Sequence, residues 1–151
     1  MLDDDPVNLL ACMNVEAGWL AWSCEQVLRH AALTPETVTE LNRRGGALFP
    51  VLMDDLGKAE DMLVLFLSRG VDVNAGDQEA QDWTALHSFA SDGDRQRAGL
   101  LLEHGARVDV RATNGLTPLD VARKAQARRP DDPRTAEMIR LLKAAGRASP
   151  P

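Results

Sequence analysis

Histidine and cysteine supply much of the catalysis and metal binding that proteins perform near neutral pH, and this chain of 151 residues has few of them. The histidines are His30, His87 and His104, and the cysteines are Cys12 and Cys24. Their spacing matches no zinc motif, and the sequence has no Gly-rich phosphate loop or Gly-x-Ser-x-Gly turn. Because catalysis needs a nucleophile, a base and an orienting group together, we predict no catalytic, metal-binding or cofactor-binding residue and no enzymatic activity. The cysteines have apolar neighbours and are predicted to be buried, reduced thiols.

A basic stretch near the C-terminus is the candidate for nucleic-acid binding. It contains Arg123, Lys124, Arg128, Arg129 and Arg134. Sites for single strands combine such charges with aromatic side chains on which bases stack, whereas this stretch has no aromatic residue and includes Asp131 and Asp132. A solvated helix and loop is therefore favoured over a nucleic-acid site.

Charge is distributed unevenly along the chain. Residues 1–94 hold 17 acidic and 5 basic side chains, a net charge of −12, while residues 95–151 hold 6 acidic and 12 basic side chains, a net charge of +6. Scattered surface charge often has no specific role, but this asymmetry can also steer a partner, and the acidic front predicts a partner with a basic surface. The acidic start Asp3, Asp4 and Asp5 and the lack of a long apolar run predict a cytoplasmic protein without a membrane partner.

A repeat of 33 residues sets the architecture. Thr84, Ala85, Leu86, His87 and Thr117, Pro118, Leu119, Asp120 are separated by this distance, and each tetrad opens an apolar-periodic stretch. Leucine-rich segments run into a glycine three times, at Gly70, Gly105 and Gly146, which predicts that these glycines end equivalent helices. The first two continue as Val71, Asp72, Val73, Asn74 and Ala106, Arg107, Val108, Asp109.

In its period, its helix-start tetrad and its exit after glycine, the chain resembles the ankyrin-repeat family. The resemblance implies an all-α solenoid of about four stacked helical pairs, with short β-turn fingers and irregular terminal caps. It also implies that His87 belongs to the hydrogen-bond network of a helix-start turn. Thr84 and Thr117 are expected to cap helices, and Pro118 suits a first helical turn.

We expect one domain over residues 1–146. Its predicted parts are a degenerate capping pair at 15–46, repeats at 47–75 and 84–110, a C-terminal repeat at 117–146 and a flexible tail at 147–151. The capping pair is expected to consist of a long apolar helix over 15–33, containing Trp19 and Trp22, and a helix over 35–44 that begins after Thr34.

Two insertions distinguish the repeats. The loop from Gly76 to Asp82 is two residues longer than its counterpart and carries Asp77, Glu79 and Asp82. The last pair has about eight extra residues around 128–133, where Pro130 and Pro133 predict a loop.

Ankyrin-type proteins bind partners through their fingers and the exposed side of each first helix. Transferred position by position, the partner-binding residues are predicted to be Asp77, Gln78, Glu79, Gln81, Trp83, Ser91, Asp92, Arg111, Thr113, Leu116 and Lys124. Trp83 has two interpretations, an interface anchor or a residue that packs against the adjacent finger.

The predicted function is non-enzymatic binding of another protein by a monomer. A small binding protein with an acidic N-terminal part resembles bacterial ankyrin-type immunity proteins that neutralise a toxin. The composition, rich in Ala, Arg and Asp, is compatible with a bacterial source. A scaffold or stabilising adaptor for a larger assembly is the alternative, with an enzyme a distant third. The sequence does not separate inhibitor from adaptor.

Overall fold

The protein is described by a computed structural model that covers residues 5–14 and 16–148. Within these residues the secondary structure is helical, and β-type pairing is limited to isolated bridges that join Asp77 to Arg44 and to Trp83. The elements are α1 (Pro6–Met13), α2 (Gly18–Val27), the π-helix η1 (Leu28–Ala32), α3 (Pro35–Arg43), α4 (Leu48–Val51), α5 (Leu56–Ser68), α6 (Ala85–Asp92), α7 (Arg95–Glu103), α8 (Pro118–Arg128) and α9 (Pro133–Ala148).

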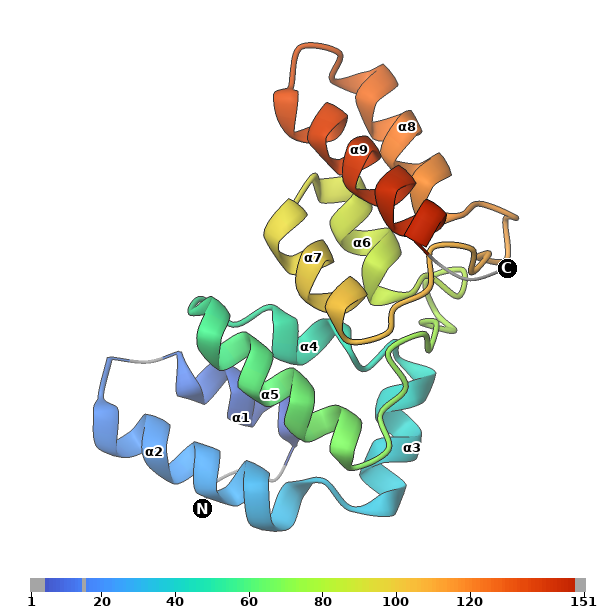
Figure 1. Cartoon of the computed structure of the whole chain (residues 1–151). Helices are drawn as coiled ribbons and strands as arrows, with labels where there is room; N and C mark the ends of the chain where they lie inside the picture. The colour runs from blue at the N-terminus through green and yellow to red at the C-terminus, as the bar shows by residue number, and fades with distance from the viewer. Residues whose placement is uncertain (1–4, 15, 149–151) are drawn as a thin grey trace.

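Four helical pairs stack along one axis, which confirms the predicted all-α solenoid (Figure 1). The pairs are α1 with α2, α4 with α5, α6 with α7, and α8 with α9. The first helices α1, α4, α6 and α8 form a continuous row, since each touches the next. A row of this kind buries the apolar face of each pair against its neighbours, as repeat proteins require.

The N-terminal pair differs from the expected one. Helix α1 begins after Asp5, whose carboxylate accepts a hydrogen bond from the Val7 N–H, and Pro6 occupies its first turn. This helix, and not the one over 35–43, pairs with α2. The predicted long helix over 15–33 starts at Gly18 and changes to a π-helix at Leu28, while Val15 lies outside the described residues.

The cysteines contradict the prediction of reduced thiols. Cys12 on α1 and Cys24 on α2 form a disulfide with their Cα atoms 6.2 Å apart. Cys24 is fully buried, so the apolar surroundings were predicted correctly, but the sequence did not show that the pairing of α1 with α2 brings the two sulfurs together. Disulfides persist in oxidising compartments and are rare in the cytosol, and the cytoplasmic location stays a prediction.

Helix α3 occupies the place that a finger has in the later repeats. It begins after Thr34, whose hydroxyl accepts a hydrogen bond from the Thr37 N–H, as the sequence predicts. Its C-terminal end meets the next finger, because Asn42 Nδ2 donates to the Gly70 carbonyl and the Asp72 N–H donates to Asn42 Oδ1. The α3 helix therefore connects the first pair to the ankyrin-like part of the chain.

The C-terminal pair is longer than the one before it. Helix α8 has 11 residues against 8 in α6, and α9 has 16 against 9 in α7. A loop separates the two helices at the predicted place, but it consists only of residues 129–132. Most of the extra residues lengthen the two helices. Gly146 lies inside α9, so the prediction that it ends a helix is wrong. Helical backbone continues through this position, in contrast to the positive φ angles of Gly70 and Gly105.

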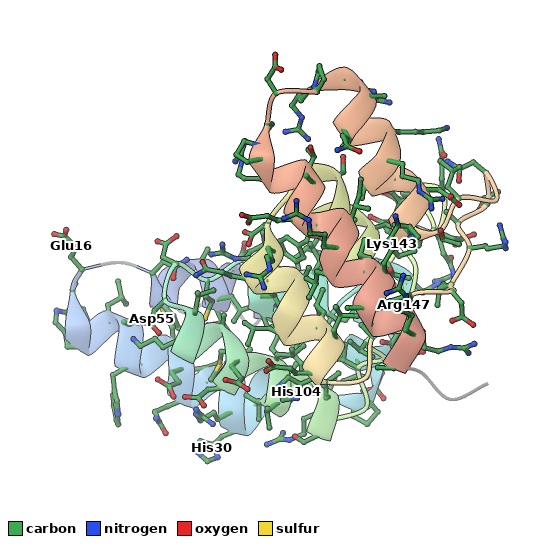
Figure 2. All side chains as sticks on the ribbon, turned by 45° about the horizontal axis from the view of Figure 1, so that its top comes forward. Glu16, His30, Asp55, His104, Lys143 and Arg147 are labelled. Carbon is green, nitrogen blue, oxygen red and sulfur yellow. A yellow bond between two sulfur atoms is a disulfide. The ribbon has the colours of Figure 1, made fainter. Side chains whose placement is uncertain are left out.

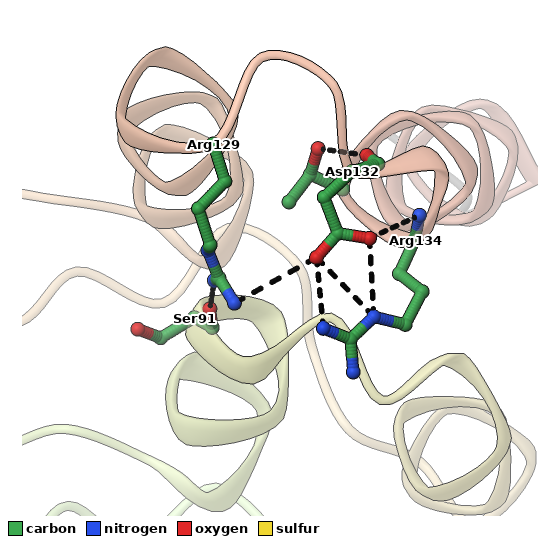
Figure 3. A network of polar contacts seen from close by, with 5 residues as sticks. Ser91, Arg129, Asp132 and Arg134 are labelled. Atoms are coloured by element: carbon green, nitrogen blue, oxygen red, sulfur yellow. Dashed lines mark hydrogen bonds and ion pairs between the residues drawn. The ribbon is translucent and has the colours of Figure 1, made fainter.

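Helix α9 also covers Arg147 and Ala148, two residues of the expected tail, and residues 149–151 lie outside the described part. The loop before α9 is held by Asp132 (Figure 3). Its carboxylate accepts hydrogen bonds from the guanidinium and backbone N–H of Arg134, and these bonds lower the pKa of Asp132. Arg129 donates to the Ser91 carbonyl of α6 and so joins this loop to the preceding repeat.

Candidate partner-binding face

The turn that starts α6 is built around a buried histidine. His87 is fully buried, and the backbone N–H of Thr84 donates to its Nδ1 over 3.1 Å. A backbone N–H can only donate, so Nδ1 is unprotonated and Nε2 carries the proton, which it donates to the Leu116 carbonyl over 3.0 Å. The predicted role of His87 in a helix-start network is confirmed, and the residue also fixes the next finger to this repeat.

Burial lowers the pKa of His87 below its ordinary value, because a charged imidazole would lose its hydration, while the bond to the Leu116 carbonyl acts in the opposite direction. The neutral ring is the form that the turn requires. His87 therefore stabilises the fold and is not placed as a proton-transfer group.

The equivalent turn of α8 uses a carboxylate. Thr117 donates to Asp120 Oδ2 from its N–H and from its hydroxyl, over 3.1 and 2.9 Å. These two hydrogen bonds lower the pKa of Asp120. Asp120 caps its own helix in this way but makes no contact comparable to the bond between His87 and Leu116.

The two fingers are tied together at their tips. Gln81 and Asp82, in the extended loop 76–82, have φ angles of 59° and 58°, a left-handed conformation that is uncommon outside glycine. The Thr113 N–H donates to the Gln81 carbonyl, the Thr113 hydroxyl donates to Asp82 Oδ2, and the Asn114 amide donates to Gln81 Oε1. These bonds hold the longer loop against the next finger.

Asparagines repeat one connection between successive fingers. Asn42 bridges the Gly70 carbonyl and the Asp72 N–H, and Asn74 bridges the Gly105 carbonyl and the Arg107 N–H. The sequence analysis recognised Asn74 in the exit motif but missed Asn42. The spacing of 32 residues between the two asparagines was the available signal.

Five of the predicted binding residues surround one hollow between the fingers and the first helices. We call it the finger hollow; its volume is about 230 Å³. The predicted residues that line it are Gln81, Trp83, Ser91, Leu116 and Lys124. Asn114, Val121 and Arg128 complete the lining and were not predicted. Positions 121, 124 and 128 share a helical face, a pattern that points Arg128 toward Lys124 and would have found it.

The remaining predicted residues lie outside the finger hollow. Asp77 accepts a hydrogen bond from the Glu79 N–H and pairs with Trp83 through a backbone bridge, and the Gln78 N–H donates to the Arg43 carbonyl. Glu79 and Asp92 are exposed.

Arg111 and Thr113 belong to the second finger. Arg111 donates to the Gly115 carbonyl within its own finger, and Thr113 is engaged by the first finger as described. Both side chains therefore help to hold the finger in shape.

Trp83 is half-buried between the finger and α6. Its ring stacks on His87 with centroids 6.1 Å apart, and its indole Nε1 is buried without an acceptor among the described residues. Trp83 thus contributes to packing of the finger and at the same time forms a wall of the finger hollow.

A second hollow, of about 160 Å³, lies between α1 and α4. It is lined by Val7, Leu10, Ala11, Asn14, Phe49, Leu52 and Met53, and Leu52 is 51% exposed. The sequence analysis did not predict it, since it depends on the pairing of α1 with the following repeat.

The described residues contain no group of three or more His, Cys, Asp or Glu side chains that could hold a metal ion. His104, which is labelled in Figure 2, is paired, and its Nε2 lies 3.0 Å from Glu60 Oε1. Among the helices described, none is long and apolar enough to cross a membrane.

Comparison with known proteins agrees with this geometry. Residues 55–145 match the family model for ankyrin repeats in three copies. The chain belongs to the ankyrin-repeat family. Ankyrin repeats are typically non-enzymatic protein-interaction modules, so membership supports a protein-binding chain.

The curated proteins include a relative over a short segment. The chain is 59% identical over 39 residues to the potassium channel AKT3 of rice, Oryza sativa subsp. japonica. This match covers 26% of the chain and 4% of the channel. The likeness is therefore limited to a short segment of each protein.

Proposed function

We propose that this ankyrin-repeat protein binds one protein partner through its fingers and first helices and inhibits that partner by occupying its surface. The proposal includes the narrower role of a bacterial immunity-type protein that neutralises a toxin. The finger hollow carries the proposal, because it brings together five residues predicted independently as contact positions. At about 230 Å³ it is smaller than the roughly 300–1,000 Å³ of most small-molecule sites, which favours a side chain of a protein partner.

The acidic part of the chain, residues 1–94, supports an electrostatic contribution to partner binding. Glu79 and Asp92 are exposed on the predicted face, and no ion pair involves either among the described residues. A basic partner surface would be attracted to them. Replacing both by Gln and Asn should slow association several-fold at low salt and reduce its salt dependence, measured by stopped-flow or surface plasmon resonance.

Capture from the native host followed by mass spectrometry tests the proposed function. Two double variants are compared with the wild type. The face variant carries Gln78→Arg and Asp92→Arg on the predicted binding face. The control carries Gln96→Arg and Glu103→Arg, which add the same charge at exposed positions of α7. We expect the wild type and the control to capture the same protein and to abolish its activity at equimolar ratio. The face variant should capture less of it.

The outcomes distinguish the alternatives. A partner that stays fully active when saturated would favour a scaffold or adaptor over an inhibitor. Equal capture by both double variants would show that the fingers and first helices are not the interface and would overturn the proposal.

A further inference from the structure

The hydrogen-bond acceptors around the finger hollow are already in use. The Gln81 carbonyl accepts the Thr113 N–H, and Gln81 Oε1 accepts the Asn114 amide. Asn114 Oδ1 accepts the Leu116 N–H. The Leu116 carbonyl in turn accepts from His87 Nε2. Each of these oxygens is therefore already engaged by at least one donor of the protein.

Oxygen atoms on the other walls of the finger hollow also already accept hydrogen bonds. The Ser91 carbonyl accepts from Arg129, and the Trp83 carbonyl accepts the Asp77 N–H. Asp82, the acidic side chain of the adjoining loop, accepts the Thr113 hydroxyl. This carboxylate of the finger tip is thus already bonded to the opposite finger.

The donors of the finger hollow, by contrast, are free. Lys124 and Arg128 are exposed at its rim, and neither side chain has an ion pair or hydrogen bond to any residue that the structure describes. The Ser91 hydroxyl and the Gln81 side-chain N–H groups likewise meet no acceptor in the described part of the chain.

Other cations of the same region are paired. Arg123 lies 3.7 Å from Asp120, and both Arg129 and Arg134 contact Asp132. The unpaired cations that line this hollow are therefore set apart from the paired ones around α8 and its loop. Leu116 and Val121 add an apolar wall beside them.

We propose that the finger hollow receives an acidic segment of the protein partner, with an Asp or Glu carboxylate placed between Lys124 and Arg128. A carboxylate supplies only acceptors, which matches a site whose acceptors are used and whose donors are free. Its methylene groups can contact Leu116 and Val121. This inference rests on the proposed function and names the chemistry of the partner at that face.

The two proposals together describe a partner with charges of both signs. A basic region would face the acidic front, and an acidic segment would enter the finger hollow. Such a pattern fixes the orientation of the partner on the solenoid, because reversing it would bring like charges together.

The position of Trp83 provides a direct readout. The chain has three tryptophans, and Trp19 and Trp22 are 74% and 64% exposed on α2, where substitution by Phe should leave the fold intact. In the full-length Trp19→Phe, Trp22→Phe protein, emission comes from Trp83 in the wall of the hollow. The probe is a short Glu-Gly repeat peptide, and the Gln-Gly peptide of equal length is its neutral counterpart.

We expect the Glu-Gly peptide to change Trp83 emission saturably and the Gln-Gly peptide to bind at least about tenfold more weakly. Lys124→Gln with Arg128→Gln should weaken binding of the Glu-Gly peptide about fivefold to tenfold. The charge-matched control, Arg140→Gln with Lys143→Gln on α9, should bind as the parent protein does. Circular dichroism and melting temperature establish that each variant is folded.

Equal binding of the two peptides, or an equal loss in the α9 control, would overturn the acidic-segment proposal. So would a single-stranded oligonucleotide that competes more strongly than the peptide and depends on Lys124 and Arg128, because the site would then bind nucleic acid. If the peptide fails while capture of the host partner still depends on the face residues, the proposed function stands and this inference falls. If face-dependent capture also fails, both are rejected.

Discussion

The interior repeat α6–α7 and the terminal repeat α8–α9 carry the same sequence motif but use it differently. In α6 the fourth residue of the tetrad is His87, which closes its own turn and reaches the Leu116 carbonyl of the next repeat. In α8 the same place is held by Asp120, which closes its own turn alone. Among the described residues, Asp120 has no bond of this kind to another finger. The motif therefore specifies the turn in both repeats, and His87 in addition connects its repeat to the next.

The largest difference between the two repeats should appear in their cores. Leu101 of α7 and Leu142 of α9 are both buried, but the α6–α7 pair has repeats on both sides. Leu101→Ala should lower the free energy of unfolding by about 2–5 kcal/mol, and Leu142→Ala by about 1 kcal/mol less, because a terminal helix can relax into the space. Urea unfolding followed by circular dichroism measures both. Equal losses would mean that the terminal repeat is packed as rigidly as the interior one.

Replacing the glycine that follows a leucine-rich segment by alanine should change the stability of the protein in opposite directions at Gly105 and Gly146. Gly105 has a φ of +93°, so Gly105→Ala should destabilise the protein by about 1 kcal/mol. Gly146 is helical, and a Cβ there would lie 3.6 Å from Val108 Cγ2, an ordinary contact. Gly146→Ala should therefore stabilise the protein by about 0.5–1 kcal/mol. A loss of melting temperature in Gly146→Ala would contradict the continuation of α9 through this position.

The smallest expected effect is a difference in pH dependence. The pKa of His87 is lowered in the folded state, so the unfolded chain binds more protons below about pH 6.5, and stability from this turn falls as the pH drops from there through the folded pKa. The pKa of Asp120 is lowered from 3.8, so its contribution is present above that pH and is lost only as the pH falls through a still lower folded value.

Urea titrations from pH 7 to about pH 5 should therefore show a loss of stability in the wild type that His87→Gln removes and Asp120→Asn retains. Asp120→Asn keeps His87 and every other histidine of the chain, so it serves as the matched control for His87→Gln. A loss of the same size in His87→Gln would show that His87 is not the source of the pH dependence.

The fold was predicted most accurately in the segments where the local residue pattern and the 33-residue period agree. The α6, α7 and α8 helices, the threonine caps of α6 and α8 and the role of His87 in the helix-start turn all follow from residues within one repeat. The finger hollow was partly predicted, since Gln81, Trp83, Ser91, Leu116 and Lys124 line it. Whether these residues contact a partner stays a prediction.

The features that were missed depend on contacts between segments distant in the chain. The Cys12–Cys24 bond requires α1 to pair with α2, and α1 itself is an eight-residue helix too short to give a clear periodic signal. Asn42 lies on a helix and not in an exit motif, so its likeness to Asn74 appears when the fingers are seen side by side. Gly146 follows the same leucine-rich pattern as Gly105, but it lies inside α9 whereas Gly105 has a φ of +93°, a difference that the local pattern does not contain.

The disulfide between Cys12 and Cys24 has a mechanical consequence. When the molecule is pulled by its two ends, the 12 residues of separation between the cysteines cannot extend. Fully extended, these residues would span about 40 Å at about 3.5 Å per residue. The disulfide holds the two Cα atoms 6.2 Å apart, so the bond withholds roughly 35 Å of chain length from the stretched molecule. An optical-tweezers experiment should recover this length on adding a reducing agent, as a longer final extension after the last repeat has opened.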